Sequence, residues 1–401
     1  MARTEPANRF DEVIDRRGTN STKWDGAVEA LTAEQAAADP LPMWVADMDF
    51  RAPPAVIDAI EQVARHGVFG YPAGAAESYL EAVTGWQQRR FGWQVRPEWV
   101  VPSAGILTAI KTVIQAFTAP EDSVLVLSPV YGHFYSAIEL NSRIPIGAGL
   151  IRVGDGYCYD PTAFEESILA DTKLFILCNP HNPTGNVWSA DELASMGEIC
   201  ARHGVLVLAD EVHQDLILNP GLRHVPFASL GESFAVNSIT CTAASKTFNL
   251  AGMQCANVFI ADSGLREGFL RQYDRNASTL VNNLGMAATQ AAYTHGEPWL
   301  TDLLGYLRGN HRHFAQEVAK LDCGLHVLPT DSLYLAWMDC RGLGMDPGEL
   351  MNFMLTKARL WLDDGRKFGP EGHGYMRVNL GCPRATIDEA LERLSAAFAG
   401  L

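Results

Sequence analysis

The middle of the chain alternates short apolar runs with longer amphipathic stretches. Runs rich in apolar residues, with the length of buried β-strands, occur at residues 99–101, 124–127, 173–178, 205–209 and 238–241. Apolar residues at helical spacing lie between them, as at 106–117 and 135–140. Ser189 and Glu192 have the spacing of a capping box, which predicts the start of a helix. Strands that are apolar on both faces and alternate with helices predict an α/β fold with a mainly parallel sheet.

This alternation fades after about residue 290. The remaining pattern predicts helices and strands in mixed order, with a long helix at 298–320, an alternating strand at 332–337, a helix at 347–358, a strand at 375–379 and a helix at 386–399. Such a mixture is typical of a smaller α+β domain. We therefore expect a large domain at 51–290 and a small C-terminal domain at 291–401, which the N-terminal segment 1–50 joins.

Composition narrows the class of protein. The 401 residues include 31 Lys and Arg against 47 Asp and Glu, a net charge of −16 without a basic block, which argues against sequence-independent nucleic-acid binding. No apolar run is long enough to span a bilayer, and the first six residues are polar rather than a secretion signal. The eight cysteines are scattered without a Cys-x-x-Cys pair, as in reducing compartments. We expect a cytoplasmic protein without nucleic-acid or membrane partners.

A metal site is not indicated. His311 and His313 lie two residues apart on an expected helix, so they point to different faces. No cysteine flanks them at the spacing of a zinc site.

Two candidate site segments follow predicted strands, where ligands bind in open α/β sheets. Residues 179–185, Asn-Pro-His-Asn-Pro-Thr-Gly, form a rigid turn that could aim the Asn182 amide at a ligand, or could be only a loop. Asp210 stands directly at the end of the 205–209 strand. Its alternatives are a helix N-cap and a surface salt bridge.

Two cationic residues complete the set. Lys246 follows the 238–241 run among small and hydroxyl residues, so it is either solvated or partly desolvated with a lowered pKa, ready to form a Schiff base. Arg377 lies inside a predicted strand. A buried arginine needs an anion, which is either a structural carboxylate or the α-carboxylate of a substrate.

The order Asn-Pro-Thr-Gly at 182–185, Asp-Glu at 210–211, Ser-Lys at 245–246 and then Arg377 resembles the fold-type I, pyridoxal-phosphate (PLP) dependent aminotransferase superfamily, class I/II. Three further motifs resemble its cystathionine β-lyase and cysteine-S-conjugate β-lyase branch: Trp44–Phe50, His213 where aminotransferases place a tyrosine, and Arg377–Arg384. The resemblance implies a large domain with a mainly parallel seven-stranded sheet covered by helices, plus a smaller α+β domain.

The resemblance also assigns roles around the cofactor ring. Lys246 would hold PLP as a Schiff base and move the Cα proton of the substrate. Asp210 would pair with the pyridine nitrogen, Asn182 would bind the ring 3′-oxygen, and Tyr131 would stack on the ring unless it only packs in the core. His213 would lie beside the ring oxygen.

Other residues would bind the cofactor phosphate and the substrate. The N–H groups of Gly105 and Ile106 open a helix and could hold the phosphate, together with Ser245. By resemblance, Tyr71 would reach the phosphate of the neighbouring subunit, which implies a homodimer with shared active sites. Arg377 would clamp the substrate carboxylate, and Asn182 would assist it.

These roles imply a carbon–sulfur β-lyase acting on cystathionine, cysteine or a cysteine S-conjugate, with thiol, pyruvate and ammonia as products. The alternative is a PLP aminotransferase, or another PLP enzyme of secondary metabolism that acts on a modified amino acid. A catalytically idle regulatory protein is less favoured, because Lys246, Asp210, Asn182 and Arg377 are all present.

One position departs from the family pattern. The family usually has a hydroxyl residue three positions before the lysine, where it holds the cofactor phosphate, but this chain has Ala243. Thr242 is one residue too early and, in an extended segment, faces the other way. The phosphate is therefore expected to have fewer side-chain donors than usual.

Overall fold

A computed structural model describes residues 8–278 and 280–399. Its large sheet has seven strands, in the order β2 (Val100–Ser103), β10 (Ala256–Phe259), β9 (Ser238–Thr242), β8 (Leu206–Asp210), β7 (Thr172–Cys178), β3 (Ser123–Ser128) and β4 (Ile144–Gly149). β10 runs antiparallel to both of its neighbours, and the other neighbouring pairs are parallel. The mainly parallel seven-stranded sheet is confirmed.

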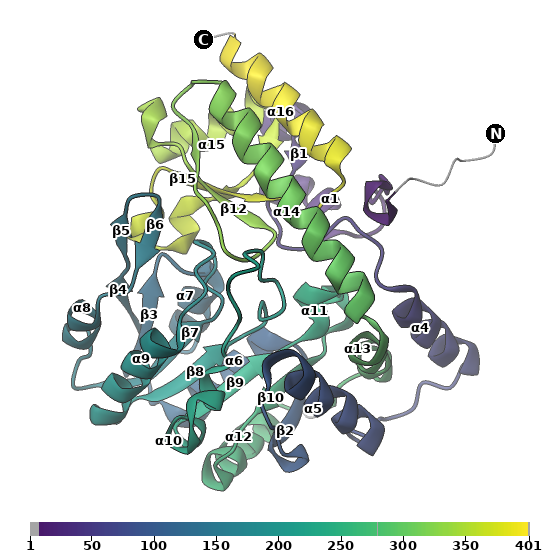
Figure 1. Ribbon diagram of the computed structural model, residues 1–401, viewed down its shortest axis with the longest axis vertical. Helices are drawn as coiled ribbons and strands as arrows, with labels where there is room; N and C mark the ends of the chain where they lie inside the picture. Colours follow the sequence, from purple (N-terminus) through teal and green to yellow (C-terminus); the bar gives the residue numbers. More distant parts are fainter. Residues whose placement is uncertain (1–7, 279, 400–401) are drawn as a thin grey trace.

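Helices cover both faces of this sheet (Figure 1). Residues of β3 alternate between the faces, because successive side chains of a strand point in opposite directions. Val124 and Val126 pack against the side of α6 (Ile106–Phe117), α7 (Gly132–Glu139) and α12 (Ser263–Arg275). Leu125 and Leu127 pack on the opposite side, which carries α8 (Pro161–Glu166) and α9 (Ala190–Arg202).

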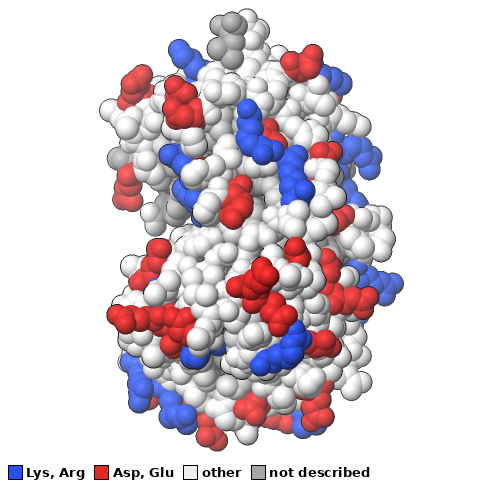
Figure 2. Space-filling model, turned by 90° about the vertical axis from the view of Figure 1, so that its left-hand side faces the viewer, with Lys and Arg blue, Asp and Glu red and all other residues white. Residues whose placement is uncertain are grey.

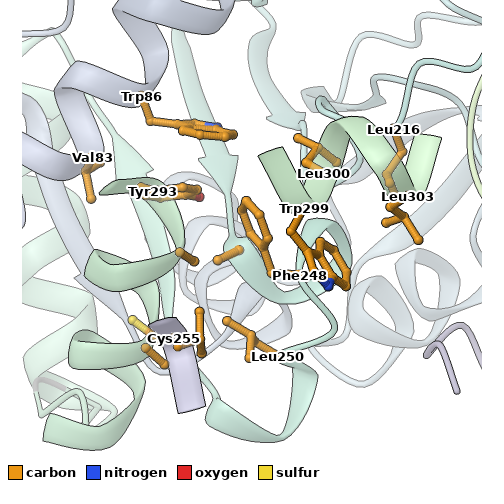
Figure 3. Packing of buried hydrophobic residues seen from close by; sticks show 14 of the residues in the cluster. Val83, Trp86, Leu216, Phe248, Leu250, Cys255, Tyr293, Trp299, Leu300 and Leu303 are labelled. Atoms are coloured by element: carbon orange, nitrogen blue, oxygen red, sulfur yellow. The ribbon is translucent and has the colours of Figure 1, made fainter. Parts of the chain in front are cut away.

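A third group of helices packs at the β2 end of the sheet. It consists of α4 (Pro54–His66), α5 (Glu77–Phe91) and α13 (Asn283–His295), with α13 contacting both of the others (Figure 1). Their core contains stacked rings of Trp86 and Tyr293, whose centroids lie 5.2 Å apart. Phe248 and Trp299 extend this core toward the segment that carries Lys246 (Figure 3).

The C-terminal part contains a four-stranded antiparallel sheet in the order β11 (His326–Val327), β12 (Leu335–Asp339), β15 (Tyr375–Asn379) and β14 (Asp363–Asp364). The helices α14 (Glu297–Lys320), α15 (Pro347–Thr356) and α16 (Arg384–Ala399) belong to the same part (Figure 1). The expected smaller α+β domain is confirmed.

The N-terminal segment contacts this smaller part. β1 (Leu41–Pro42) pairs in parallel with β13 (Leu360–Trp361). The backbone N–H of Asn379 donates to the Met43 carbonyl, and Met43 is buried in the same core as Met376 and Ile387. The division at residues 50 and 290 stays a proposal, and α13 runs across the second boundary.

Some strand predictions were inaccurate. The strand expected at 332–337 is β12 at Leu335–Asp339, because Leu333 has a positive φ of 72° that breaks the extended backbone. β10 was not predicted, since the polar Asn257 interrupts its apolar run, although Asn257 is buried and accepts a hydrogen bond from the Tyr79 hydroxyl. The capping box of Ser189 and Glu192 at the start of α9 is confirmed.

The remaining features concern surface and charge. Within residues 8–278 and 280–399, no helix has the length and apolarity needed to cross a membrane. The polar first six residues lie outside this described part.

On α14, the His311 Nε2 lies 3.1 Å from the Leu333 carbonyl oxygen, whereas His313 contacts Asp388. Figure 2 shows acidic and basic side chains mixed over one face of the molecule.

Candidate active site

A cavity of about 160 Å³ lies at the carboxyl ends of β7, β8 and β9. Its lining includes Gly105, Ile106, Tyr131, Asn182, Asp210, His213, Ser245 and Lys246. These residues come from five separate stretches of sequence, and each was a candidate from the sequence alone. The structure therefore brings eight of the ten candidate residues to one cavity, and only Tyr71 and Arg377 do not line it.

Lys246 lies on the short helix α11 (Ala244–Thr247), directly after β9. Its Nζ donates a hydrogen bond of 2.6 Å to the carbonyl oxygen of Ala46. Burial, together with the nearby Arg377 charge, lowers the pKa of Lys246 to about 8. Roughly a tenth of such amines are neutral at pH 7, far more than for a solvated lysine. Lys246 is therefore equipped to act as a nucleophile and a base.

The helix turn that carries Lys246 is fixed by the two residues that follow Lys246 in the sequence. The Thr247 hydroxyl donates to the buried Asp215 carboxylate at 3.0 Å. Phe248 packs edge-on against Trp86, with ring centroids 5.7 Å apart, and also lies beside Trp299 (Figure 3). These contacts leave the backbone around Lys246 little freedom, so its amine is aimed at a defined point of the cavity.

Asp210 is the last residue of β8 and is almost completely buried. Among the described residues, the backbone N–H of Val212, at 3.2 Å, is its hydrogen-bond donor, and no cation lies within ion-pair distance. Burial raises the pKa of Asp210 to about 7. A buried carboxyl group without a charged partner is costly, so this one fits a ligand that brings a cationic N–H donor into the cavity.

His213 lies three residues after Asp210 and is also buried. Burial, strengthened by the charges of Lys246 and Arg377, holds the pKa of His213 well below its usual range, so the imidazole is uncharged at neutral pH. Its Nδ1 has no hydrogen-bond partner within the described part of the chain. This histidine offers the cavity a neutral hydrogen-bonding group.

The first turn of α6 forms the anion-binding end of the cavity. Gly105 is the N-cap with φ 98°, and a Cβ there would come 2.7 Å from the Gln254 Oε1. Among the described residues, no side chain caps this helix. The Gly105 N–H, expected at the phosphate, instead donates to the Ser103 carbonyl at 2.8 Å, so the N–H groups that follow it, including that of Ile106, are available for an anion. Ser245 lies in the same lining.

Ala243 lines the cavity, whereas Thr242 does not. Thr242 is paired across the sheet with Asn257, and its buried hydroxyl faces away from the site. Among the residues that line the cavity, Lys246 is the only lysine or arginine. A phosphate group at this end would therefore be held mainly by N–H groups, Ser245 and the helix dipole.

Arg377 lies behind Asn182 rather than in the lining. Its Nη1 donates to the Asn182 Oδ1 at 3.2 Å, and its Nη2 donates to the Trp44 carbonyl at 3.0 Å and to the Asp363 Oδ2 at 2.5 Å. The guanidinium carbon lies 4.9 Å from the centroid of the Phe368 ring. Of the two anions left open by the sequence, the structure contains the structural carboxylate, Asp363.

Tyr71 is 93% exposed in the connection between α4 and α5 and does not line the cavity of its own chain (Figure 1). Val68 and Phe69 in the same connection are also exposed. A role at the phosphate requires a second copy of the chain.

Sequence reasoning missed several participants. The Ala46 carbonyl contacts Lys246, but a main-chain group leaves no signal in the residue type. Gln254 and Cys255 line the cavity, and nothing in the sequence around them distinguishes them from loop residues. Asp363 was missed because two consecutive acidic residues do not predict the strand β14, which pairs Asp363 with Arg377.

Comparison with known proteins agrees with this arrangement. The family of aminotransferases class I and II matches residues 40–394. The cystathionine β-lyase PatB of Bacillus subtilis is 42% identical over 97% of this chain and 99% of its own. Cystalysin from Treponema denticola, solved with a pyridoxal 5′-phosphate cofactor, superimposes with a TM-score of 0.92 at 32% identity, covering 98% of this chain and 99% of its own.

A further solved structure is the PLP-bound C–S lyase from Staphylococcus hominis, with a TM-score of 0.89, 30% identity and coverage of 98% of this chain and 99% of its own. The family match spans most of the chain, and the relatives match along nearly their whole length. The chain belongs to the family of aminotransferases class I and II.

Proposed function

We propose that this protein is a PLP-dependent carbon–sulfur β-lyase. It cleaves cystathionine, cysteine or a cysteine S-conjugate and, with one water, yields a thiol, pyruvate and ammonia. The observation that carries this proposal is the convergence of Lys246, Asp210 and His213 on one cavity. The relative from Bacillus subtilis is a cystathionine β-lyase, and the structural neighbour from Staphylococcus hominis is a C–S lyase.

The residues present fit PLP as the cofactor. Lys246 supplies a buried amine with a lowered pKa, which suits the aldehyde of PLP. Asp210 supplies a buried carboxylate that has no cationic partner among the described residues, which suits the protonated ring nitrogen. The uncapped start of α6 at Gly105 suits the phosphate. When bound, PLP supplies an electron sink for the negative charge that develops at Cα.

Each residue of the site then has a separate role toward the cofactor or the substrate. The Lys246 Nζ would take the Cα proton, and its lowered pKa of about 8 makes the neutral, basic form more accessible than in a solvated lysine. Asp210 in its ionised form would accept the ring N–H and so keep that nitrogen protonated. Asn182 would hold the ring oxygen, Tyr131 would pack on the ring, and Arg377 would orient the substrate carboxylate.

His213 supports elimination over transamination. Because its imidazole is uncharged, it would serve as a hydrogen-bond partner for the ring oxygen rather than as an acid. Aminotransferases have a tyrosine at this position by the family pattern. The thiolate leaves from Cβ, which is the substrate atom next to the Cα that Lys246 deprotonates.

We further propose a homodimer with shared active sites. The phosphate of PLP is a dianion, and the lining offers Lys246 as its one cation. The partner subunit's Tyr71, from the exposed connection at 67–76, would be an additional donor. Mixing Tyr71→Phe protein with Lys246→Ala protein should then restore activity through hybrid dimers with one unimpaired site, whereas an active monomer in sedimentation would contradict the dimer.

The test of the reaction is a panel of cysteine thioethers given to the holoprotein, with thiol, pyruvate and keto-acid release followed separately. We expect thiol and pyruvate without any added keto acid, and no release by Lys246→Ala. A strict requirement for 2-oxoglutarate without thiol release would instead make the protein an aminotransferase. The cytoplasmic location is a proposal that cell fractionation tests.

A further inference from the structure

The arginine assigned to the substrate carboxylate already holds a carboxylate of its own chain. Arg377 lies on β15 and Asp363 is its register partner on β14. The Asp363 Oδ2 accepts a hydrogen bond of 2.5 Å from the Arg377 Nη2. Both groups are buried, with the Arg377 side chain 3% and the Asp363 side chain 12% exposed.

This contact leaves the guanidinium without a free edge. An arginine has five N–H groups and binds a carboxylate bidentately through one of two edges, each of which includes Nη2. Both hydrogens of the Arg377 Nη2 are used, one by the Trp44 carbonyl and one by Asp363. Of the remaining hydrogens, Nη1 gives one to Asn182, and the buried Nε has no partner within the described residues. A substrate carboxylate can bind bidentately only after one Nη2 acceptor has left.

Asp363 is the acceptor that can leave. The Trp44 oxygen belongs to the main chain of the N-terminal segment, whereas a carboxylate can turn about its side-chain bonds. The Asp363 Oδ1 is already 2.9 Å from the Lys367 Nζ, which is half exposed and lies 5.5 Å over the Trp44 ring. If Asp363 turns from Arg377 toward Lys367, it keeps a cationic partner.

We propose that Asp363 is an internal competitor of the substrate carboxylate for Arg377, and that Lys367 retains Asp363 when the substrate binds. This inference rests on the proposed function only in assigning the substrate's α-carboxylate to Arg377. Asp363 is thus a positioning residue, since it does not line the cavity of Lys246. It weakens substrate binding and leaves the reacting atoms untouched.

The charges around Arg377 also indicate that Asp363 weakens binding of the substrate carboxylate. Arg377, Lys367 and Asp363 together carry a net charge of +1, which one substrate carboxylate neutralises. Arg377 does not need Asp363 for its orientation, because Asn182, the Trp44 carbonyl and the Phe368 ring also hold it. Removing the Asp363 charge should therefore strengthen carboxylate binding rather than loosen the arginine.

The test uses the holoprotein and 3-(methylthio)propionate, a thioether carboxylate that lacks the amino group and so cannot react. Isothermal titration calorimetry should give a Kd about tenfold lower for Asp363→Asn than for the unchanged protein. With S-methyl-L-cysteine as substrate, the KM of this variant should fall in parallel while kcat changes little. Asp363→Ser should show the same direction and serves if the asparagine variant does not fold.

The chain offers a matched control in Asp364→Asn. Asp364 is the next residue of β14 and pairs with Arg366, 2.9 Å from its Nε, instead of with Arg377. Its replacement should leave the Kd unchanged. An unchanged or higher Kd in Asp363→Asn would overturn the inference, because it would make Asp363 a support of Arg377.

The two proposals fail separately. If no thioether releases a thiol but Asp363→Asn still binds the probe more tightly, the lyase proposal falls and the competition stands. If Arg377→Gln binds the probe as well as the unchanged protein, Arg377 is not the carboxylate site, and the inference falls whatever the reaction is.

Discussion

The two ends of the site use different groups to bind anions. At the α6 end, the donors are main-chain N–H groups of the first helical turn, including that of Ile106, and the Ser245 hydroxyl, whereas the Gly105 N–H donates to the Ser103 carbonyl. At the β15 end, Arg377 is held in a network of charges with Asp363 and Lys367. Main-chain groups are fixed by the fold and cannot exchange partners, whereas side chains can. The first end suits a resident cofactor, and the second suits a substrate that binds and leaves with each turnover.

Lys246 lies between these ends, and its loss should have the largest effect. Lys246→Ala should lower thiol release by about a thousandfold or more, because it removes both the nucleophile and the base. Borohydride reduction of the unchanged holoprotein should fix PLP on the peptide that contains Lys246. Lys173→Ala, at an exposed lysine of β7, is the control and should retain full activity. A different labelled lysine would move the site elsewhere.

The next effect tests the charged end alone. Arg377→Gln should lower kcat/KM for S-methyl-L-cysteine by about a hundredfold, since it removes charge-assisted hydrogen bonds to the carboxylate. The affinity of the apoprotein for PLP should change much less, because the phosphate binds at the other end. Arg366→Gln is the control, since Arg366 is half exposed and pairs with Asp364. An equal loss of PLP affinity in Arg377→Gln would show that the two ends are not independent.

A smaller effect is expected at the main-chain end. Ala243→Ser adds a hydroxyl to the lining near α6 and should tighten PLP binding by about tenfold, while the elimination rate per bound cofactor stays nearly the same. Titration of the apoprotein with PLP measures this. Thr242→Val is the control, because its hydroxyl faces away from the cavity. Equal or weaker affinity in the serine variant would mean that residue 243 does not face the phosphate.

The same contrast explains what the sequence could predict. β15 at 375–379 and the residues at the ends of β8 and β9 were predictable, because apolar runs mark buried strands and polar residues follow them directly. The α6 end was predictable in part, since a glycine before an apolar helix marks an uncapped N-terminus. Side chains with distinctive chemistry at strand ends therefore carry most of the site's signal.

The charged end was only half predictable. Arg377 was a candidate because an arginine in an apolar strand needs an anion, but Asp363 was not, because β14 is two acidic residues long and its pairing depends on tertiary contacts. The contact of Lys246 with the Ala46 carbonyl joins residues 200 positions apart through a main-chain atom. Pairings of this kind are fixed by packing, which residue type does not encode.

The last effect is on the stability of the apoprotein rather than on catalysis, and it concerns Asp210, the acidic group between the two ends. Burial without a cationic partner raises its pKa to about 7, so the native apoprotein keeps a proton that the unfolded chain has released above about pH 4. The native state therefore binds more protons than the unfolded state, and this contribution to the free energy of unfolding falls as the pH rises from 4 to 7.

We expect the melting temperature of the apoprotein, compared with that of Asp210→Asn, to decrease from pH 5 to pH 7 and then level off. Asp49→Asn is the control, because Asp49 is equally buried but lies 2.7 Å from the Lys23 Nζ. Against the effect of burial, the Lys23 charge and hydrogen bonds from Lys23, Trp24 and Arg16 lower the pKa of Asp49. The Asp49 contribution is present above its ordinary pKa and is lost only at lower pH, so its difference from the unchanged protein should stay flat over this range. A flat difference for Asp210 as well would mean that its carboxylate has a cationic partner in the apoprotein, and the cavity would then lack the group that selects a protonated ring.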